Sequence, residues 1–558
     1  MKLAIVSIFT LGILFAFLLS IILGVLYFLG KLDLLFSIIF TGIIFFLQWL
    51  ISPYFSDIIY RWFYKLKWIS FEDLERGDME VAEFIKKTCN KYKIKIPKIG
   101  FIDDNNPQIF CYGSAAFNAR IVFTSGIFTY LNTEERKAVF GHELGHIVHR
   151  DFIIMTIAAF LLSLLYHISQ ALFKSIRNTS QAPSRGSRSN RGGIAIILGV
   201  VSYIFYLIGT YILLWLSRTR EYYADEFSAK ETNNTDALAS ALIKIAYGII
   251  ARPEEKKQRE LMHGTRTLGI MDFKAAKGIG LAYINGLKLR SWEPIEKILL
   301  FDLKNPWAFI YELGSSHPLT AKRIKRLEKV KNVTMFDFER IDKKYPIDTK
   351  LLHANFLRDI FFIFLPPIFI LTSFSLIILL SFLNLITLPF KLPQLIILLF
   401  VGVGIMIILK TTYLYPEEEP KKTNLLELMG DVYASPIRGK AVEIDGEIVG
   451  RGIPGLILSE DMMLQDDTGL VYLNYEGIFP LFSNLVFALF KLDKLIGQKV
   501  KIRGWFVRDL APRISLKEIV VEGKIIKSRA RTLGIISGII MILLSLILFI
   551  VFYYFKVF

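Results

Sequence analysis

The chain has 558 residues and a formal net charge of +17, and 53% of its residues are hydrophobic. Only two cysteines are present, so the sequence excludes a disulfide framework and a further metal site built from thiols. The positive charge does not indicate nucleic acid as a partner, because basic residues crowd the cytoplasmic ends of membrane spans, where they meet anionic lipid.

Two uncharged segments open the chain, at residues 3–30 and 34–56. Each exceeds the roughly 20 apolar residues that a helix needs to cross a bilayer. We therefore predict an N-terminal transmembrane hairpin over residues 1–56. A cleaved signal peptide is the poorer interpretation, because the first apolar segment is too long and a second span follows it directly.

Residues 57–151 are predicted to form the first part of an α+β catalytic domain. Helical sequence covers residues 72–92, and strand-like sequence lies near residue 99 and at residues 121–124. A further helix begins before residue 141, since the residues leading up to it contain no helix breaker.

This helix carries an H-E-x-x-H motif at His142, Glu143 and His146. Helix positions i and i+4 lie one above the other, so both imidazoles can bind one metal ion. Zinc lowers the pKa of a bound water to about 7, and the adjacent carboxylate of Glu143 can then take its proton. The motif indicates one Zn²⁺ per chain and hydrolysis, most often of a peptide bond. Two histidines on a polar helix face are the alternative.

Uncharged residues at 152–173 and 192–217 predict a second transmembrane hairpin over residues 152–217. The loop between them, residues 174–192, is rich in Ser, Gly and Arg, as is typical of a disordered linker. Alternation of seven spans places this basic loop outside the cell. Either the hairpin departs from the positive-inside rule or its helices enter the membrane without crossing it.

Residues 218–356 are predicted to complete the catalytic domain. Glu221 and Asp225 are four residues apart and share a helix face. One can be the third protein ligand that a catalytic zinc requires, while the other accepts a hydrogen bond from a ligating imidazole. A solvated E-x-x-x-D pattern is the alternative for this segment taken alone. Residues 266–310 form an insertion that the motifs do not require; a packing subdomain is the expected role, and a cover over the cleft is the alternative.

Two further apolar runs, residues 360–390 and 392–409, predict a transmembrane hairpin over residues 357–415. A Pro-Pro pair interrupts the first run, so neighbouring helices must satisfy the backbone groups that proline leaves free. A partly re-entrant pair is the alternative. Residues 532–555 predict a C-terminal transmembrane helix.

A linker at residues 416–431 leads into a domain at residues 432–526 with alternating Val, Ile and Gly residues. Turn signals recur at three places, Asp445-Gly446, Pro454-Gly455 and Asp466-Asp467-Thr468-Gly469. The pattern predicts five or six short strands in a small barrel similar in shape to an oligonucleotide-binding (OB) fold. Apolar residues 478–490 predict a helix that plugs this barrel or lies on the bilayer.

Three motifs together resemble the HtpX-type membrane metalloproteases, which share a clan with the CAAX prenyl proteases. The motifs are Gly141–His146 followed by Asp151, Ser217–Asp225 followed by Ser228-Ala229, and Ser316–Leu319 leading to Arg323-Ile324. They occur in the family's order. With the flanking membrane helices, the resemblance covers residues 1–330.

The resemblance implies that His142, His146 and Glu221 are the zinc ligands. It also implies that Glu143 is the general base and acid, and that Asp225 supports a ligating histidine.

Further residues follow from the same resemblance. His317 matches a family histidine that lies over the metal, where it can stabilise the oxyanion of the tetrahedral intermediate. Arg323 is a weaker candidate for a site residue, because simple pairing with a carboxylate would also account for it. The family's edge strand for substrate backbone corresponds to Gln108–Gly113, in which Gln108 replaces the usual asparagine. The predicted substrate-binding residues are Phe110, Cys111, Tyr112 and Gly113.

Basic residues near the ends of the second, fourth, sixth and seventh spans gather on one side of the membrane, and the positive-inside rule makes that side the cytoplasm. The metal site lies on the same side. The predicted fold is a multi-pass α-helical membrane protein with a zincin-like α+β catalytic domain and a C-terminal OB-like β-barrel.

The predicted function is a zinc-dependent endopeptidase of the cell membrane, and the resemblance implies a role in membrane-protein quality control. Its expected partners are membrane lipid, peptide or membrane-protein substrates, and a membrane protein recruited by the barrel, without nucleic acid. Two alternatives remain open. One is a CAAX-type prenyl-protein processing protease, and the other is a non-catalytic membrane scaffold that works through its C-terminal barrel.

Overall fold

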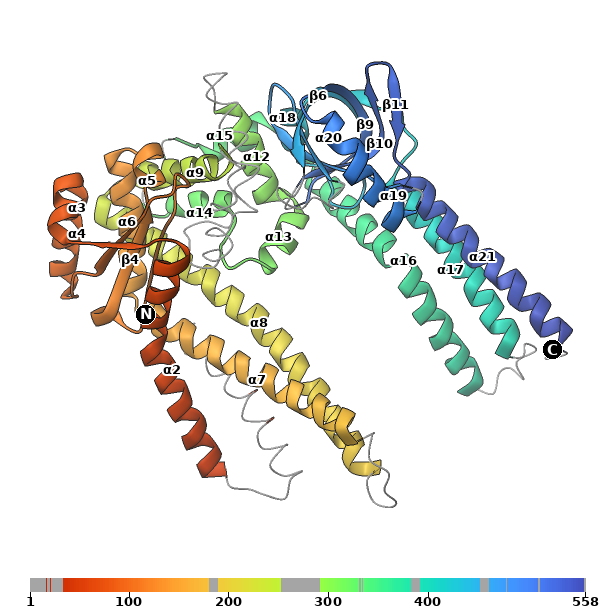
Figure 1. Cartoon of the computed structure of the whole chain (residues 1–558), viewed down its shortest axis with the longest axis horizontal. Coiled ribbons are helices and arrows are strands. Elements are labelled where there is room, and N and C mark those ends of the chain that lie inside the picture. The colour runs from red at the N-terminus through yellow and green to blue at the C-terminus, as the bar shows by residue number, and fades with distance from the viewer. Residues whose placement is uncertain are drawn as a thin grey trace. The chain divides into compact units, whose positions relative to one another are not determined.

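The computed structural model describes residues 17, 21, 34–179, 189–251, 292–330, 333, 335–382, 392–451, 461–477, 479–509 and 512–555. The chain clusters into two compact units (Figure 1). The first comprises Met1–Ala276 and Phe309–Ile341, and the second comprises Lys277–Ala308 and Asp342–Phe558.

The first unit contains a four-stranded sheet in the order β1-β2-β4-β3. Its strands are β1 (Lys67–Ile69), β2 (Lys98–Ile102), β3 (Ile109–Gly113) and β4 (Ala119–Thr124). β2 and β4 pair in parallel, and the other neighbours pair antiparallel. Every residue of β4 is buried, as expected for an apolar central strand. The predicted strands near residue 99 and at residues 121–124 are confirmed, and β3 is left at the edge of the sheet.

The helix predicted over residues 72–92 is wrong in one respect, because two helices cover this segment. They are α3 (Phe71–Gly77) and α4 (Met79–Tyr92). Asp78 separates them with an extended backbone, and its carboxylate accepts a hydrogen bond from the N–H of Val81 at 3.3 Å. Asp78 therefore ends one helix and caps the next.

The motif helix, α6 (Thr133–Val148), begins at a capping box. The Asn132 side chain accepts a hydrogen bond from the N–H of Glu135 at 2.9 Å, and the Glu135 carboxylate accepts one from the N–H of Asn132 at 2.8 Å. Arg150, with a φ of 59°, turns the chain after α6. The membrane helix α7 (Asp151–Thr179) follows at once, so the motif helix and the membrane hairpin are directly connected.

Helix α8 (Ser189–Thr232) runs unbroken for 44 residues from the predicted span into the segment that holds Glu221. It crosses α6 at close range. A Cβ added at Gly145 would lie 3.1 Å from the Cα of Ala224, closer than most Cβ contacts, so this glycine favours the close approach. The Ser228 hydroxyl also donates a 2.5 Å hydrogen bond to the Ala138 carbonyl.

Among the described residues, five helices are long and apolar enough to cross a membrane. They are Asp151–Gln170, Ile196–Thr232, Thr349–Leu376, Gln394–Leu414 and Ala530–Tyr554. The predicted second span forms α2 (Leu34–Phe63). The predicted first span lies outside the described residues except for Phe17 and Ile21, as do residues 180–188 of the basic loop. Within the first unit, α2, α7 and α8 extend from the same side of the sheet domain (Figure 1).

In the second unit, α16 (Thr349–Phe382) continues through Pro366 and Pro367, and α17 (Leu392–Leu414) packs beside it. Pro367 has no N–H to donate to the carbonyl of Ile363. Lys410 of α17 replaces that donor, with its Nζ 3.2 Å from the Ile363 oxygen. Helix packing therefore satisfies a group that the proline leaves free.

Five strands of the second unit close a barrel in the order β6-β7-β8-β10-β9, and β9 pairs back with β6. They are β6 (Lys440–Arg451), β7 (Met462–Gln465), β8 (Leu470–Asn474), β9 (Lys499–Val507) and β10 (Arg513–Val521). β8 and β10 pair in parallel, and a helical segment connects β8 to β9. The structure confirms the predicted OB-like barrel.

One turn prediction in the barrel is wrong. Asp445 and Gly446 lie inside β6, where a Cβ on Gly446 would come within 2.6 Å of the Gln465 carbonyl oxygen. This glycine permits a close strand approach and makes no turn. The turn predicted at residues 466–469 is confirmed, since the Asp466 carboxylate accepts hydrogen bonds from two backbone N–H groups of that turn. Pro454-Gly455 lies outside the described residues.

The described part of the 266–310 insertion includes α12 (Glu293–Lys304), which belongs to the second unit. Just after it, Asn305 donates a 2.8 Å hydrogen bond to the Val432 carbonyl, at the start of the barrel domain. The Arg508 guanidinium lies 3.7 Å from the ring centroid of Phe301. This segment therefore braces the barrel. Its residues 266–291 lie outside the described part.

The remaining elements are α5 (Gly126–Tyr130), α9 (Thr235–Ala251), α13 (Pro306–Leu313), α14 (Thr320–Leu327), α15 (Phe338–Lys344), β5 (Lys421–Lys422), α18 (Leu425–Met429), α19 (Pro480–Val486), α20 (Leu492–Leu495), β11 (Lys524–Lys527) and α21 (Ala530–Tyr554). A short 3-10 helix covers Ala116–Asn118, and a π-helical turn covers Phe487–Lys491.

Candidate active site

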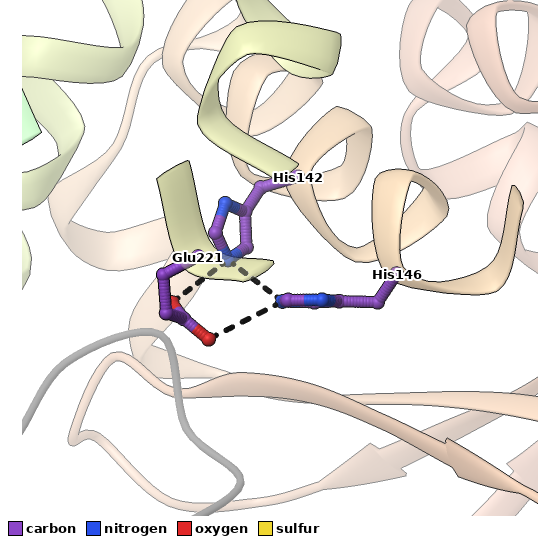
Figure 2. A group of neighbouring side chains, drawn as sticks. All are labelled: His142, His146 and Glu221. Carbon is purple, nitrogen blue, oxygen red and sulfur yellow. Dashed lines mark hydrogen bonds and ion pairs between the residues drawn. The ribbon is translucent and has the colours of Figure 1, made fainter. Parts of the chain in front are cut away.

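His142, His146 and Glu221 converge on one point between α6 and α8 (Figure 2). The Nε2 atoms of the two imidazoles are 3.2 Å apart. His142 Nε2 also lies 3.5 Å from Glu221 Oε2, and His146 Nε2 lies 3.5 Å from Glu221 Oε1. All three side chains are buried. Helix α6 supplies both histidines one turn apart, and α8 crosses it to supply the carboxylate.

These separations fit a tetrahedral metal ion. Ligand atoms held about 2.0–2.1 Å from zinc at tetrahedral angles lie roughly 3.3 Å from one another. In the part of the chain that the structure describes, Glu221 Oε2 is a buried oxygen without a hydrogen-bond partner. Each imidazole turns its Nδ1 toward an aspartate, so both Nε2 atoms point toward the same place. An imidazole whose Nε2 carries no proton can bind a metal ion there.

The electrostatics of His142 also favour a cation at this point. Burial disfavours the charged imidazole, but the Asp225 and Glu221 carboxylates outweigh it and raise the pKa of His142 to about 9. The cluster therefore carries a surplus of negative charge. Either a proton or a metal ion can neutralise that surplus.

Behind His142 lies a buried chain of charges that we call the Asp225 arm, consisting of His142, Asp225 and Arg323. Asp225 Oδ1 lies 2.9 Å from His142 Nδ1. Arg323 of α14 binds the same carboxylate with two nitrogens, at 2.8 and 2.6 Å. Its Nη2 is also 3.7 Å from Glu221 Oε2. Bidentate pairing of this kind fixes both distance and orientation.

Behind His146 lies a second chain, the Asp151 arm, consisting of His146, Asp151 and Arg220. His146 Nδ1 and Asp151 Oδ2 are 2.7 Å apart, at hydrogen-bond distance. Arg220 Nε lies 2.9 Å from the other carboxylate oxygen. In the sequence, Asp151 is visible only as part of a motif, and Arg220 only as a basic residue at the end of the predicted fourth span. Asp151 faces back toward His146 because Arg150 reverses the chain, and residue spacing alone does not reveal that turn.

Glu143 is buried beside the two histidines. Burial raises the pKa of its carboxyl group, while His142 and His146 oppose that rise. A bound cation would oppose it further. A raised pKa suits a carboxylate that first accepts a proton and later returns it.

The sequence model of peptidase family M48 matches residues 75–331. A protease HtpX homolog from Pyrococcus abyssi is 30% identical over 319 residues, which cover 57% of this chain and 94% of the relative. Protease HtpX homolog 2 from Saccharolobus solfataricus is 30% identical over 304 residues, which cover 54% of this chain and 86% of the relative. This chain belongs to peptidase family M48.

Membership of family M48, with HtpX homologues as relatives, makes the chain a membrane metalloprotease. Every residue of the metal cluster and both arms lies inside the matched segment, whereas the barrel lies outside it. The crystal structure of S. mikatae Ste24p is also similar, with a TM-score of 0.33 and 20% identity over 59% of this chain and 67% of that chain.

His317 is buried and lies beside Glu221. Its Nε2 lies 3.6 Å from Glu221 Oε1, and its Nδ1 lies 2.9 Å from the Ser316 hydroxyl. Its backbone N–H donates to the Ser315 hydroxyl at 3.2 Å. The structure thus brings this predicted site residue to the metal cluster from a third segment of the chain.

The predicted substrate strand is β3, which pairs with β4 along one edge. The side chains of Phe110, Cys111 and Tyr112 are buried, so the backbone of this strand is the part suited to pairing with a peptide. The Cys111 thiol lies 3.6 Å from the backbone oxygen of Glu143 and ties the strand to the motif helix. Tyr112 donates a 2.8 Å hydrogen bond to Asp57 of α2.

Proposed function

We propose that the chain is a zinc-dependent endopeptidase of the cell membrane that cleaves misfolded or damaged membrane proteins at its cytoplasmic face. The buried cluster of His142, His146 and Glu221, with Glu143 beside it, carries this proposal. The two imidazole nitrogens are 3.2 Å apart, and each lies 3.5 Å from a different oxygen of Glu221. This donor set suits zinc and leaves a fourth position for water or substrate.

Each residue of the site has its own role in the proposed hydrolysis. Zinc, when bound, supplies a Lewis acid and lowers the pKa of water. Glu143 accepts the proton of the attacking water and returns it to the leaving amine. His317, beside Glu221, donates a hydrogen bond to the oxyanion that forms after attack. The edge of β3 holds the substrate backbone in line with these groups.

The location of the site supports substrates that reach the enzyme from the membrane. Glu221 lies on the same unbroken helix as a candidate span, and the motif helix leads directly into another. The basic residues Arg218 and Arg220 follow the predicted fourth span, which favours the cytoplasmic side for this end of α8.

The test uses the full chain purified in detergent. We expect about one zinc per chain by mass spectrometry, chelator-sensitive cleavage of an unfolded protein, and recovery with Zn²⁺ but not with Mg²⁺. Cleavage that survives complete metal removal contradicts the proposal. Cleavage confined to isoprenylated C-terminal peptides would identify a prenyl-protein processing protease instead. Absence of both metal and cleavage would identify a scaffold.

A further inference from the structure

The helical connection between β8 and β9 has apolar residues on both its buried face and its exposed face. It consists of α19 (Pro480–Val486), a π-helical turn (Phe487–Lys491) and α20 (Leu492–Leu495). Residues 477–490 contain no charged side chain. We call residues 479–495 the barrel helix.

The inner face of the barrel helix is fixed on the barrel. Phe487 is 1% exposed, and its ring stacks on that of Tyr475 with centroids 3.9 Å apart. Arg451 at the end of β6 donates a 2.8 Å hydrogen bond to the carbonyl of Ala488, which caps a backbone group of the π turn. The helix therefore covers the barrel, as the plug interpretation predicts, and its orientation is determined by these contacts.

The outer face of the same helix is apolar and exposed. Phe479, Phe482 and Phe490 are 72%, 71% and 66% exposed. Leu485 and Leu489 extend the stripe between them at helical spacing. Contiguous exposed aromatic and aliphatic side chains on a folded domain mark a surface that is covered in use.

The start of the barrel helix is tied to the point where α21 begins. The N–H of Arg529 donates to the Glu476 carbonyl at 2.6 Å, and the N–H of Glu476 donates to the Ser528 hydroxyl at 3.1 Å. The candidate span α21 starts at the next residue, Ala530. Phe479 is three residues from Glu476, so it lies within about 10 Å of this tie along the chain. The apolar face is thus continuous with the bilayer entry of α21.

Charge agrees with a lipid surface. Lys491 and Lys494 are exposed at the far end of the barrel helix, and Lys527 and Arg529 flank the tie to α21. Basic residues that border an apolar helix face are typical of helices lying in the headgroup region of anionic membranes.

We propose that the barrel helix lies in the membrane interface, with Phe479, Phe482 and Phe490 inserted among the acyl chains. The barrel is then held against the bilayer by this helix as well as by its flanking spans. The insertion fixes which face of the barrel is turned toward lipid and which faces remain open to protein partners.

The test places a bimane fluorophore on a cysteine introduced at Phe482 in the full chain. Lys524→Cys is the control, because this exposed residue lies beside the β10–β11 turn and away from the tie. The native Cys89 and Cys111 are buried, and the labelled parent chain gives the background. Both variants are reconstituted in phosphatidylcholine and phosphatidylglycerol vesicles with or without brominated acyl chains.

We expect loss of fluorescence in brominated vesicles at position 482 and none at position 524, with a blue-shifted emission at 482 only. A solvent-exposed spectrum at 482 overturns the proposal. So does a blue-shifted spectrum without bromine quenching, since it would mean that protein covers the face, either a second copy or a substrate. Phe490→Cys, at the other end of the stripe, must behave as Phe482→Cys does. The readout is independent of proteolysis, so it stands or falls separately from the proposed activity.

Discussion

Each of the two histidines of the M48 site is supported by an aspartate and an arginine, but the two supports are built differently. The Asp225 arm joins residues from α6, α8 and α14, and Arg323 grips its carboxylate with two nitrogens. The Asp151 arm is mostly local, because Asp151 follows His146 by five residues and Arg220 makes one contact at 2.9 Å. We infer that the Asp225 arm holds α6, α8 and α14 together, while the Asp151 arm only orients the His146 imidazole.

The largest expected effect is that of Arg323→Ala. It leaves Asp225 buried and without its guanidinium partner, which typically costs about 3–5 kcal/mol. We expect a large fall in the thermal midpoint of the full chain in detergent, together with loss of metal. Arg220→Ala is the matched change in the other arm and should cost less. Equal losses from the two variants would remove the distinction between the arms.

His317 lies outside both arms, and its removal should separate catalysis from metal binding. An oxyanion donor acts only on the transition state, so His317→Ala should lower kcat by about 100 to 1,000-fold while metal content stays unchanged. His149→Ala is the control, since this histidine follows His146 by one turn and packs against Phe227. Stoichiometric loss of metal from His317→Ala would make His317 a ligand.

Asp225→Asn and Asp151→Asn compare the two supports directly. Each removes a charge that orients a ligating imidazole, so metal affinity should fall by about 10 to 100-fold in each case, measured by competition with a chromogenic chelator. Asp225→Asn should also lower the thermal midpoint, because it leaves Arg323 buried without its ion pair. A lowered midpoint for Asp151→Asn alone would reverse the assignment of the arms.

The smallest expected effect is that of Gly145→Ala, which tests how closely α6 and α8 must approach. Gly145→Ala places a Cβ 3.1 Å from the Cα of Ala224, the residue directly before Asp225, so the helices must separate. Overpacking of this kind costs about 1–3 kcal/mol. Gly141→Ala is the control, because the three atoms nearest its Cβ, at 3.0–3.4 Å, belong to the side chains of Ser228 and Phe84 and none belongs to the backbone. Side chains yield more easily than the backbone of Ala224. Equal stability and activity of both variants would mean that the crossing tolerates a methyl group.

The sequence indicates the metal ligands because their spacing carries the information. His142 and His146 follow from the i, i+4 rule, and Glu221 follows from resemblance in the motif order. Asp225 follows from its spacing to Glu221. Asp151 and Arg220 were missed as supports, since their meeting depends on the reversal at Arg150 and on the crossing angle of α8. Neither feature has a periodic signature.

The same limit applies to the barrel. Alternating residues and turn signals predict its strands, and the strand pairing confirms an OB-like order. The Asp445-Gly446 pair misleads because glycine serves both tight turns and close strand approaches. The division of the barrel helix into a buried face and an exposed face is visible only in the structure, because an apolar run does not reveal which side chains the barrel covers.

Metal content and cleavage by Glu143→Gln in the full chain test the assigned chemistry most directly. The substitution keeps the shape of the side chain and all three ligands while it removes the base. We expect zinc content equal to that of the parent chain and no detectable cleavage of an unfolded protein. His142→Ala, measured beside it, should lose both metal and activity. Near-parental cleavage by Glu143→Gln would contradict the assigned chemistry.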